Sequence, residues 1–312
     1  YVTLENGYTY EASVVWCDTD LDLSISKIDA TNLPYATIGD SSNIKAGETD
    51  ILVDAGSKRN SADDIKNYLT DSDSTLHSYV EDNKIEYVIA THAHEDHIAA
   101  FVGESSKKNG IFYEFEIDTL IDFPMTNSKT ALYNDYKNKV EELEKNGMKH
   151  YTALECYNDE DMRVIEVAAG IEIEILYNYY YENEASSEND YSVCFMLRRG
   201  TQQFLFTGDL EHEDDAESYL VDKNNLGEVY LYKLGHHGSK TSSSMKLLNA
   251  IKPEVAIVTC VAFNDEYSDD SDNKFPTKYA IGNLVSVGTV KHLYVTSVAT
   301  FNSKGEEVDQ VG

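Results

Sequence analysis

The 312-residue chain is long enough for one large α/β domain with or without an appendage, and its 41% hydrophobic content excludes a disordered chain. Its 56 acidic and 25 basic residues give a formal net charge of -31. This charge disfavours extended nucleic acid as a partner, because phosphates need Lys and Arg to replace their counterions. No apolar run approaches the roughly eighteen residues of a membrane-spanning helix.

The chain changes character near residue 50. Residues 2–48 carry Asp- and Thr-rich strand and turn patterns, whereas later segments alternate between short apolar strands and helices. Strands are predicted at 51–56, 86–91, 119–123, 171–177, 192–197, 203–209, 229–235, 254–260 and 292–297. Helices are predicted at 61–70, 97–106, 132–146, 212–221, 242–251 and 277–286. This alternation predicts an α/β layered protein, into which the alternating pattern at 171–177 and a closing hairpin at 299–308 mix antiparallel strands.

The four cysteines are scattered and form no CxxC pair. Cys194 and Cys260 lie in apolar stretches and are predicted to be buried small residues. Together with Cys17 and Cys156 they indicate neither a disulfide framework nor a thiolate zinc site.

A cluster of metal-binding residue types follows the strand predicted at 86–91. His92, His94, Asp96 and His97 stand within six positions. Two histidines two residues apart in an extended loop project to one side, whereas Asp96 and His97 follow where the chain turns into a helix. This arrangement suits two adjacent ions better than one. A chance cluster on a solvated loop is the alternative, but the pattern is rare by chance in a chain with nine histidines.

Further acids and histidines stand at the ends of other predicted strands. These are Asp54, Asp209, His236 and His237. Strand ends in a layered α/β protein meet on one rim of the sheet, so these residues are expected to join the first cluster. Asp209 could bridge two ions, although a turn aspartate is the alternative. The histidine pair could supply one ligand and one proton donor, and the serines at 242 and 243 are plausible N-caps of the helix that follows.

The motifs together resemble one known family. VDAG (53–56), HxHxDH (92–97), TGD (207–209) and KxGHHGSKTS (233–242) are similar to the motif series of the metallo-β-lactamase superfamily. Their form is closest to the C-terminal domain of ComEC-type competence proteins and to phosphorylcholine esterase. The resemblance covers about residues 50 to 305 and implies an αββα sandwich with a dinuclear metal site on its rim.

The resemblance also implies a ligand set for two divalent ions. His92 and His94 would bind the first ion, Asp96 and His97 the second, and Asp209 would bridge them. One histidine of the pair 236–237 would complete the second ion's ligands, and the other would face the leaving group of the substrate. Zinc is the first choice of metal, with manganese or iron as alternatives, because His and Asp ligands suit all three.

The resemblance further implies that Asp54 supports the metal-binding loop from behind the metals. The chain departs from the family's usual pattern at two places, the first of which ComEC-like members share. Many family members place a third histidine for the first ion about twenty residues before the bridging aspartate, but residues 187–192 read SENDYS and contain none. Phe275 stands in NKFP (273–276), where ComEC-like members have a histidine.

The N-terminal segment resembles something different. Residues 2–48 look like the strand region around the catalytic aspartate of HtrA-type serine proteases, with Asp22 in its place. A triad also needs a histidine and a serine, and neither the upstream histidine nor a GNSGG-like loop is present. We therefore predict a non-catalytic protease-like fragment at 1–48, with strands atypical of the family, followed by a hydrolase domain at 49–312.

These inferences predict a metal-dependent hydrolase. Two ions would lower the pKa of a shared water, whose hydroxide would attack the substrate. Asp96 or Asp209 would orient it, and His236 or His237 would protonate the leaving group. The expected substrate is a small or exposed phosphodiester. The tyrosine-rich tract at 177–191, expected to be a surface loop, would suit a choline cage, although plain surface aromatics are the simpler interpretation. The alternative function is a metal-binding but catalytically inert module.

Overall fold

The structure is a computed structural model that describes residues 2–3, 9–10, 12–18, 23–28, 42–46, 48–70, 80, 82–262, 273–298, 300–301 and 307–308. The chain divides into two compact units, Tyr1–Thr37 and Ile38–Gly312. In the first unit, β1 (Val2–Thr3) pairs with β2 (Thr9–Tyr10), and β3 (Ala12–Asp18) pairs with β4 (Leu23–Ile28), both antiparallel. Asp22 lies outside the described residues, and the boundary expected at residue 48 stays a prediction.

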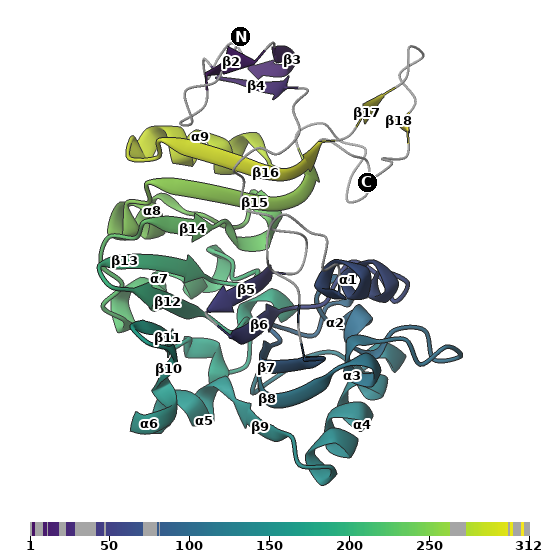
Figure 1. Cartoon of the computed structure of the whole chain (residues 1–312). Helices are drawn as coiled ribbons and strands as arrows, with labels where there is room; N and C mark the ends of the chain where they lie inside the picture. The colour runs from purple at the N-terminus through teal and green to yellow at the C-terminus, as the bar shows by residue number, and fades with distance from the viewer. Residues whose placement is uncertain are drawn as a thin grey trace. The chain divides into compact units, whose positions relative to one another are not determined.

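A five-stranded sheet forms the first half of the second unit. Its order is β5-β6-β7-β8-β9, with β5 antiparallel to β6 and the other pairs parallel. The strands are β5 (Ser42–Ala46), β6 (Thr49–Val53), β7 (Lys84–Ile89), β8 (Glu116–Asp122) and β9 (Lys149–Thr152). Beside this sheet lie α1 (Ser61–Thr70), α2 (Glu95–Val102), α3 (Ile111–Glu114) and α4 (Ala131–Lys145), as Figure 1 shows.

A seven-stranded sheet forms the second half. Its order follows the sequence, antiparallel from β10 to β13 and parallel from β13 to β16. The strands are β10 (Val164–Ala168), β11 (Ile171–Ile175), β12 (Phe195–Arg199), β13 (Gln202–Phe206), β14 (Leu231–Lys233), β15 (Val255–Ala262) and β16 (His292–Val298). Along it lie α7 (Ala216–Lys223), α8 (Met245–Ile251) and α9 (Lys278–Val287), while α5 (Ala153–Asn158) and α6 (Glu160–Arg163) connect the sheets (Figure 1).

Apolar side chains of both sheets and of the first helices form one buried cluster. The rings of Phe195 and Phe206 stack with centroids 4.7 Å apart in the seven-stranded sheet. On the helical side of the five-stranded sheet, Phe101 of α2 stacks on Phe112 of α3 at 4.6 Å. The two sheets pack around this core with helices beside each of them, which is the expected αββα sandwich.

The antiparallel strands and the closing hairpin, β17 (Thr300–Phe301) with β18 (Glu307–Val308), agree with the sequence prediction. Two local predictions are wrong. The tyrosine-rich tract is not a surface loop, because Tyr180 and Tyr181 are buried in a short 3₁₀ turn (Tyr179–Tyr181). The N-cap of α8 is Ser244, whose hydroxyl accepts from the Leu247 N–H, one residue beyond the serines expected.

The cysteines within the described part of the chain are buried and form no disulfide. These are Cys156, Cys194 and Cys260, and the burial of the last two confirms the interpretation of the two apolar stretches. Across the described residues, no helix combines the length and the apolarity that crossing a membrane requires.

Candidate metal centre

The polar residues singled out in the sequence meet at one edge of the two sheets. Asp54 follows β6, the HAHEDH segment follows β7, Asp209 follows β13, and His236 and His237 follow β14. Each position is the carboxyl end of a strand with a parallel neighbour. Because such ends gather on the same edge of a layered α/β protein, segments more than a hundred residues apart share one site.

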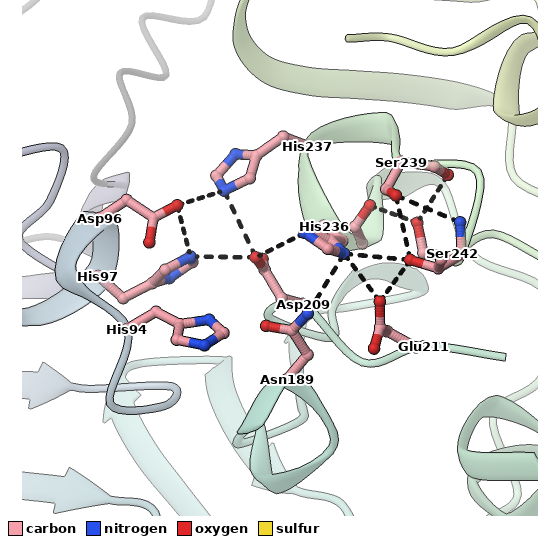
Figure 2. Close-up of polar contacts among 12 residues, drawn as sticks. His94, Asp96, His97, Asn189, Asp209, Glu211, His236, His237, Ser239 and Ser242 are labelled. Atoms are coloured by element: carbon pink, nitrogen blue, oxygen red, sulfur yellow. Dashed lines mark hydrogen bonds and ion pairs between the residues drawn. The ribbon is translucent and has the colours of Figure 1, made fainter. Parts of the chain in front are cut away.

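Four side chains converge most closely. Ligand atoms of Asp96, His97, Asp209 and His237 all lie within 4.8 Å of one another, around the centre seen in Figure 2. Asp209 Oδ2 lies 3.2 Å from His97 Nε2 and 3.5 Å from His237 Nε2. Asp96 Oδ2 lies 3.8 Å from His97 Nε2 and 3.5 Å from His237 Nε2. Three of the four are buried, and Asp96 is half-buried.

This geometry fits a divalent cation. Tetrahedral ligands bound at about 2.0–2.2 Å lie roughly 3.3–3.6 Å from one another, which is close to the four distances above. In addition, Asp209 Oδ1 is buried and accepts no hydrogen bond from any described residue. A buried carboxylate oxygen without a partner carries a desolvation cost that a bound cation removes. The cluster therefore has the donors, the spacing and the charge of a metal site.

Asp54 and Thr91 fix the orientation of His97. Asp54 Oδ2 accepts from His97 Nδ1 at 2.8 Å. The other bonds to this carboxylate come from Thr91, whose backbone N–H donates at 2.7 Å and whose hydroxyl donates at 2.9 Å. With its proton on Nδ1, neutral His97 presents the lone pair of Nε2 to the cluster, as in the carboxylate–histidine pairs of metal sites. Asp54 thus lies where its predicted supporting role requires.

The two neighbouring histidines of the GHHG turn differ in their surroundings. His237 Nδ1 donates to the carbonyl oxygen of Thr259 at 2.7 Å, so its Nε2 is an acceptor that faces Asp96 and Asp209. His236 lies outside the four-residue cluster, with Nε2 4.0 Å from Asp209 Oδ2 and Nδ1 3.1 Å from Glu211 Oε1. The positive φ of both residues, 45° and 52°, turns their side chains in different directions.

His92 and His94 form a separate pair beside the cluster. His92 Nε2 lies 3.0 Å from His94 Nδ1, and His92 is fully buried. Thr91 Oγ1, which donates to Asp54, accepts from His92 Nδ1 at 3.1 Å. His92 Nε2 is then the unprotonated nitrogen. The two facing ring nitrogens lie at hydrogen-bonding distance from each other and could hold one ion, and the first metal expected there stays a prediction.

Several residues of the site are not predicted by the sequence. Thr91 ends the strand predicted at 86–91, and Glu211 follows the TGD motif without a predicted role. Glu211 accepts hydrogen bonds from Ser187 at 2.7 Å and from Thr241 and His236. Burial raises the pKa of Glu211, but these hydrogen bonds outweigh burial and hold it at about 2. From the sequence alone, a polar residue that supports the site cannot be told from one that lies in a turn.

Comparison with known proteins finds a family match in one part of the chain. The sequence profile of the metallo-beta-lactamase superfamily matches residues 35–107, which include VDAG and HAHEDH. This segment is thus similar to the metallo-β-lactamase superfamily. Recombination protein 2 of Haemophilus influenzae is 35% identical over 78 residues, which are 25% of this chain and 9% of that protein. ComE operon protein 3 of Bacillus subtilis is 28% identical over 158 residues, which are 48% of this chain and 20% of that protein.

A DegP-like periplasmic serine endoprotease of Chlamydia pneumoniae is also similar, at 40% identity over 53 residues, 17% of this chain and 11% of the protease. The expected resemblance to a protease segment is thus confirmed. The chain spans between about a tenth and a fifth of the length of the curated relatives it matches.

Phe275 lies beside the GHHG turn. Its ring lies 6.1 Å from that of His237 in a stacked orientation and 5.8 Å from that of His236 in an edge-to-face orientation. Its apolar ring therefore faces both histidines of the turn.

Gly56 of the VDAG motif permits the close approach of the metal-binding loop. A Cβ atom there would lie 1.4 Å from the carbonyl oxygen of Asp96. Gly56→Ala is expected to displace the loop and lower the free energy of unfolding by about 3 kcal/mol or more, the upper end of overpacking effects. Urea unfolding measures this. Gly170→Ala is the control, because its added carbon meets no atom within 4 Å and only its positive φ is strained. Equal losses in the two variants would contradict the contact.

Metal uptake by the cluster is expected to depend on pH. Burial alone would lower the pKa of His97, but the charges of Asp209, Asp54 and Asp96 outweigh it and raise this pKa well above its ordinary value. Near neutral pH the metal-free protein therefore holds a proton on His97 Nε2 that an ion must displace. Apparent affinity should rise about tenfold per pH unit until His97 is neutral. Calorimetry in buffers of different ionisation enthalpy measures the proton released, and uptake without proton release would contradict this.

Proposed function

We propose that the chain is a metal-dependent hydrolase that holds two adjacent divalent ions and acts on a small phosphodiester. The observation that carries the proposal is the convergence of Asp96, His97, Asp209 and His237 within 4.8 Å, next to the facing nitrogens of His92 and His94. Ions held there would supply Lewis-acid chemistry and activate a water molecule.

Each residue of the site would have its own role in metal binding or catalysis. Asp96, His97 and His237 would hold one ion, His92 and His94 the other, and Asp209 would bridge them with its two oxygens. Asp96, the half-buried member of the cluster, would also orient the attacking water. These assignments rest on the distances above and on the lone pairs that the hydrogen bonds of Thr91 and Thr259 leave facing the centre.

His236 would act as the proton donor to the leaving group. Burial lowers its pKa, but Asp209 and Glu211 outweigh burial and raise it, which favours the protonated form that a general acid needs. Glu211 Oε1, at 3.1 Å from His236 Nδ1, orients the ring and leaves Nε2 as the nitrogen on the side of the cluster (Figure 2). The two histidines of the GHHG turn would thus act as one ligand and one acid.

A cavity of about 530 Å³ next to His94 supports a small substrate. It is lined by Ala93, His94, Glu95, Asn127, Ser128, Lys129, Thr130, Leu132 and Glu188. Its size is typical of sites for single small molecules. Lys129 offers a positive charge to an anion there, whereas the net charge of -31 opposes a long polyanion. The match to competence proteins covers a small part of those proteins, so their activities are not transferred to this chain.

The experiment is metal analysis of the purified protein combined with hydrolysis of bis-p-nitrophenyl phosphate. We expect about two ions per chain and turnover that a chelator abolishes and added metal restores. Long duplex DNA should be a poor substrate, and β-lactams should not be hydrolysed at a comparable rate. Two bound ions without turnover of phosphodiesters, thioesters or lactones would overturn the enzyme proposal in favour of an inert metal-binding module.

A further inference from the structure

We propose that the side-chain oxygen of Asn189 is a further protein ligand of the first ion, beside His92, His94 and the shared Asp209. This inference rests on the proposed two-ion site and names a residue that completes it. Two neutral nitrogens and one oxygen of a shared carboxylate leave a tetrahedral ion one ligand short, so the histidine pair needs another oxygen or nitrogen donor. The sequence offers no histidine in the stretch that precedes β12.

Asn189 lies where that donor is needed. It belongs to a 3₁₀ turn (Glu188–Tyr191) and is 6% exposed. Its Nδ2 lies 3.4 Å from His236 Nδ1. Figure 2 shows the side chain between Asp209 and His94, with the amide nitrogen on the side of His236 and the amide oxygen on the side of His94.

The amide oxygen of Asn189 has no other role in the described part of the chain. Asn189 Oδ1 is buried and accepts no hydrogen bond there. A buried amide oxygen left without a donor is costly, and such groups are rare in folded proteins unless a water or an ion completes them. Asp209 Oδ1 is a second buried oxygen of this site without a described donor. A cation held beside His94 would be a partner for such oxygens.

Hydrogen bonds hold the residues on both sides of Asn189 in place and do not involve its buried side chain. Glu188 accepts from the backbone N–H groups of Ala93 at 3.2 Å and Asn127 at 2.6 Å. On the other flank, Asn178 Nδ2 donates to the carbonyl oxygens of Asp190 and Ser192, at 2.7 and 3.0 Å. A turn fixed on both sides presents a ligand with little loss of side-chain entropy on metal binding.

The test is cobalt binding to chelator-stripped protein, followed by metal analysis and by the visible spectrum of the bound ion. Wild type should take up two ions. Asn189→Ala should keep one ion at unchanged affinity and bind the second about 100-fold more weakly or not at all, with loss of one component of the spectrum. Asn189→Asp and Asn189→His, which restore a donor, should recover the second ion. Asn138→Ala, an exposed asparagine of α4, is the control.

Each outcome has a separate meaning. Two ions bound by Asn189→Ala with the affinity of wild type would overturn the assignment of Asn189 and leave the two-ion proposal standing. A single ion in wild type would overturn the two-ion proposal itself. If Asn189→Ala does not fold, as seen by circular dichroism, the isosteric Asn189→Asp decides. It should then bind the second ion at least as tightly as wild type, and weaker binding would overturn the assignment.

Discussion

Asp209→Ala is expected to leave the purified protein with almost no bound metal and to lower hydrolysis by about 1,000-fold or more. Metal ions supply several kcal/mol of transition-state stabilisation, so their loss accounts for this factor. Asp209 is the residue on which both proposed ions depend, because Oδ2 faces His97 and His237 while Oδ1 is buried without a described donor. Asp96 Oδ2 also faces both histidines, but among the described residues only Asp209 adds to these contacts a buried oxygen without a described donor.

Metal analysis after dialysis and turnover of bis-p-nitrophenyl phosphate measure both effects. Asp209→Asn, which keeps the volume of the side chain and the hydrogen bond of the Asp209 N–H to Ser192 Oγ, separates the loss of charge from the loss of packing. Asp222→Ala is the matched control, since this exposed aspartate pairs with Lys246 at the surface. Unchanged metal content in both Asp209 variants would refute the bridging role.

The depth of burial of a strand decides whether the sequence predicts it. The apolar runs that became β7, β13 and β15 are visible because each buried strand is a block of hydrophobic residues between polar turns. The short β9 and β10 were missed. KHYT and VIEVA are partly exposed and lie at sheet edges, where burial imposes a weaker pattern. The N-cap of α8 moved by one residue because three consecutive serines offer the same hydroxyl.

The same distinction applies to the site. Histidines and aspartates in a fixed series are easily seen in the sequence, which therefore predicts the main cluster. The sequence left open whether His236 or His237 joins it, and the backbone dihedrals of the GHHG turn decide this. Thr91 and Glu211 could not be predicted, because their role depends on which polar atoms face them after folding. Whether a residue supports the site depends on its hydrogen-bond partners rather than on its own residue type.

His236→Ala and His237→Ala are expected to fail in different ways. His237→Ala should lose bound metal, because its Nε2 is one of the four converging atoms. His236→Ala should keep the metal content of wild type but lose about 10²–10⁴-fold in kcat on a diester with an alkyl leaving group, the range typical of a missing general acid. On bis-p-nitrophenyl phosphate the loss should be much smaller, because p-nitrophenolate leaves without a proton. Equal losses on the two substrates would refute the acid role.

The pH profile provides an independent test of the same assignment. A general acid must be protonated, so activity on the alkyl diester should fall at high pH as His236 loses its proton. Glu211 contributes to raising the pKa of His236, so Glu211→Gln should move this alkaline limb to lower pH by about one unit. Glu213→Gln, at an exposed acid of the same loop, should leave the limb in place. Because a purely structural role of Glu211 would lower activity at every pH without moving the limb, the direction of the shift decides between the two.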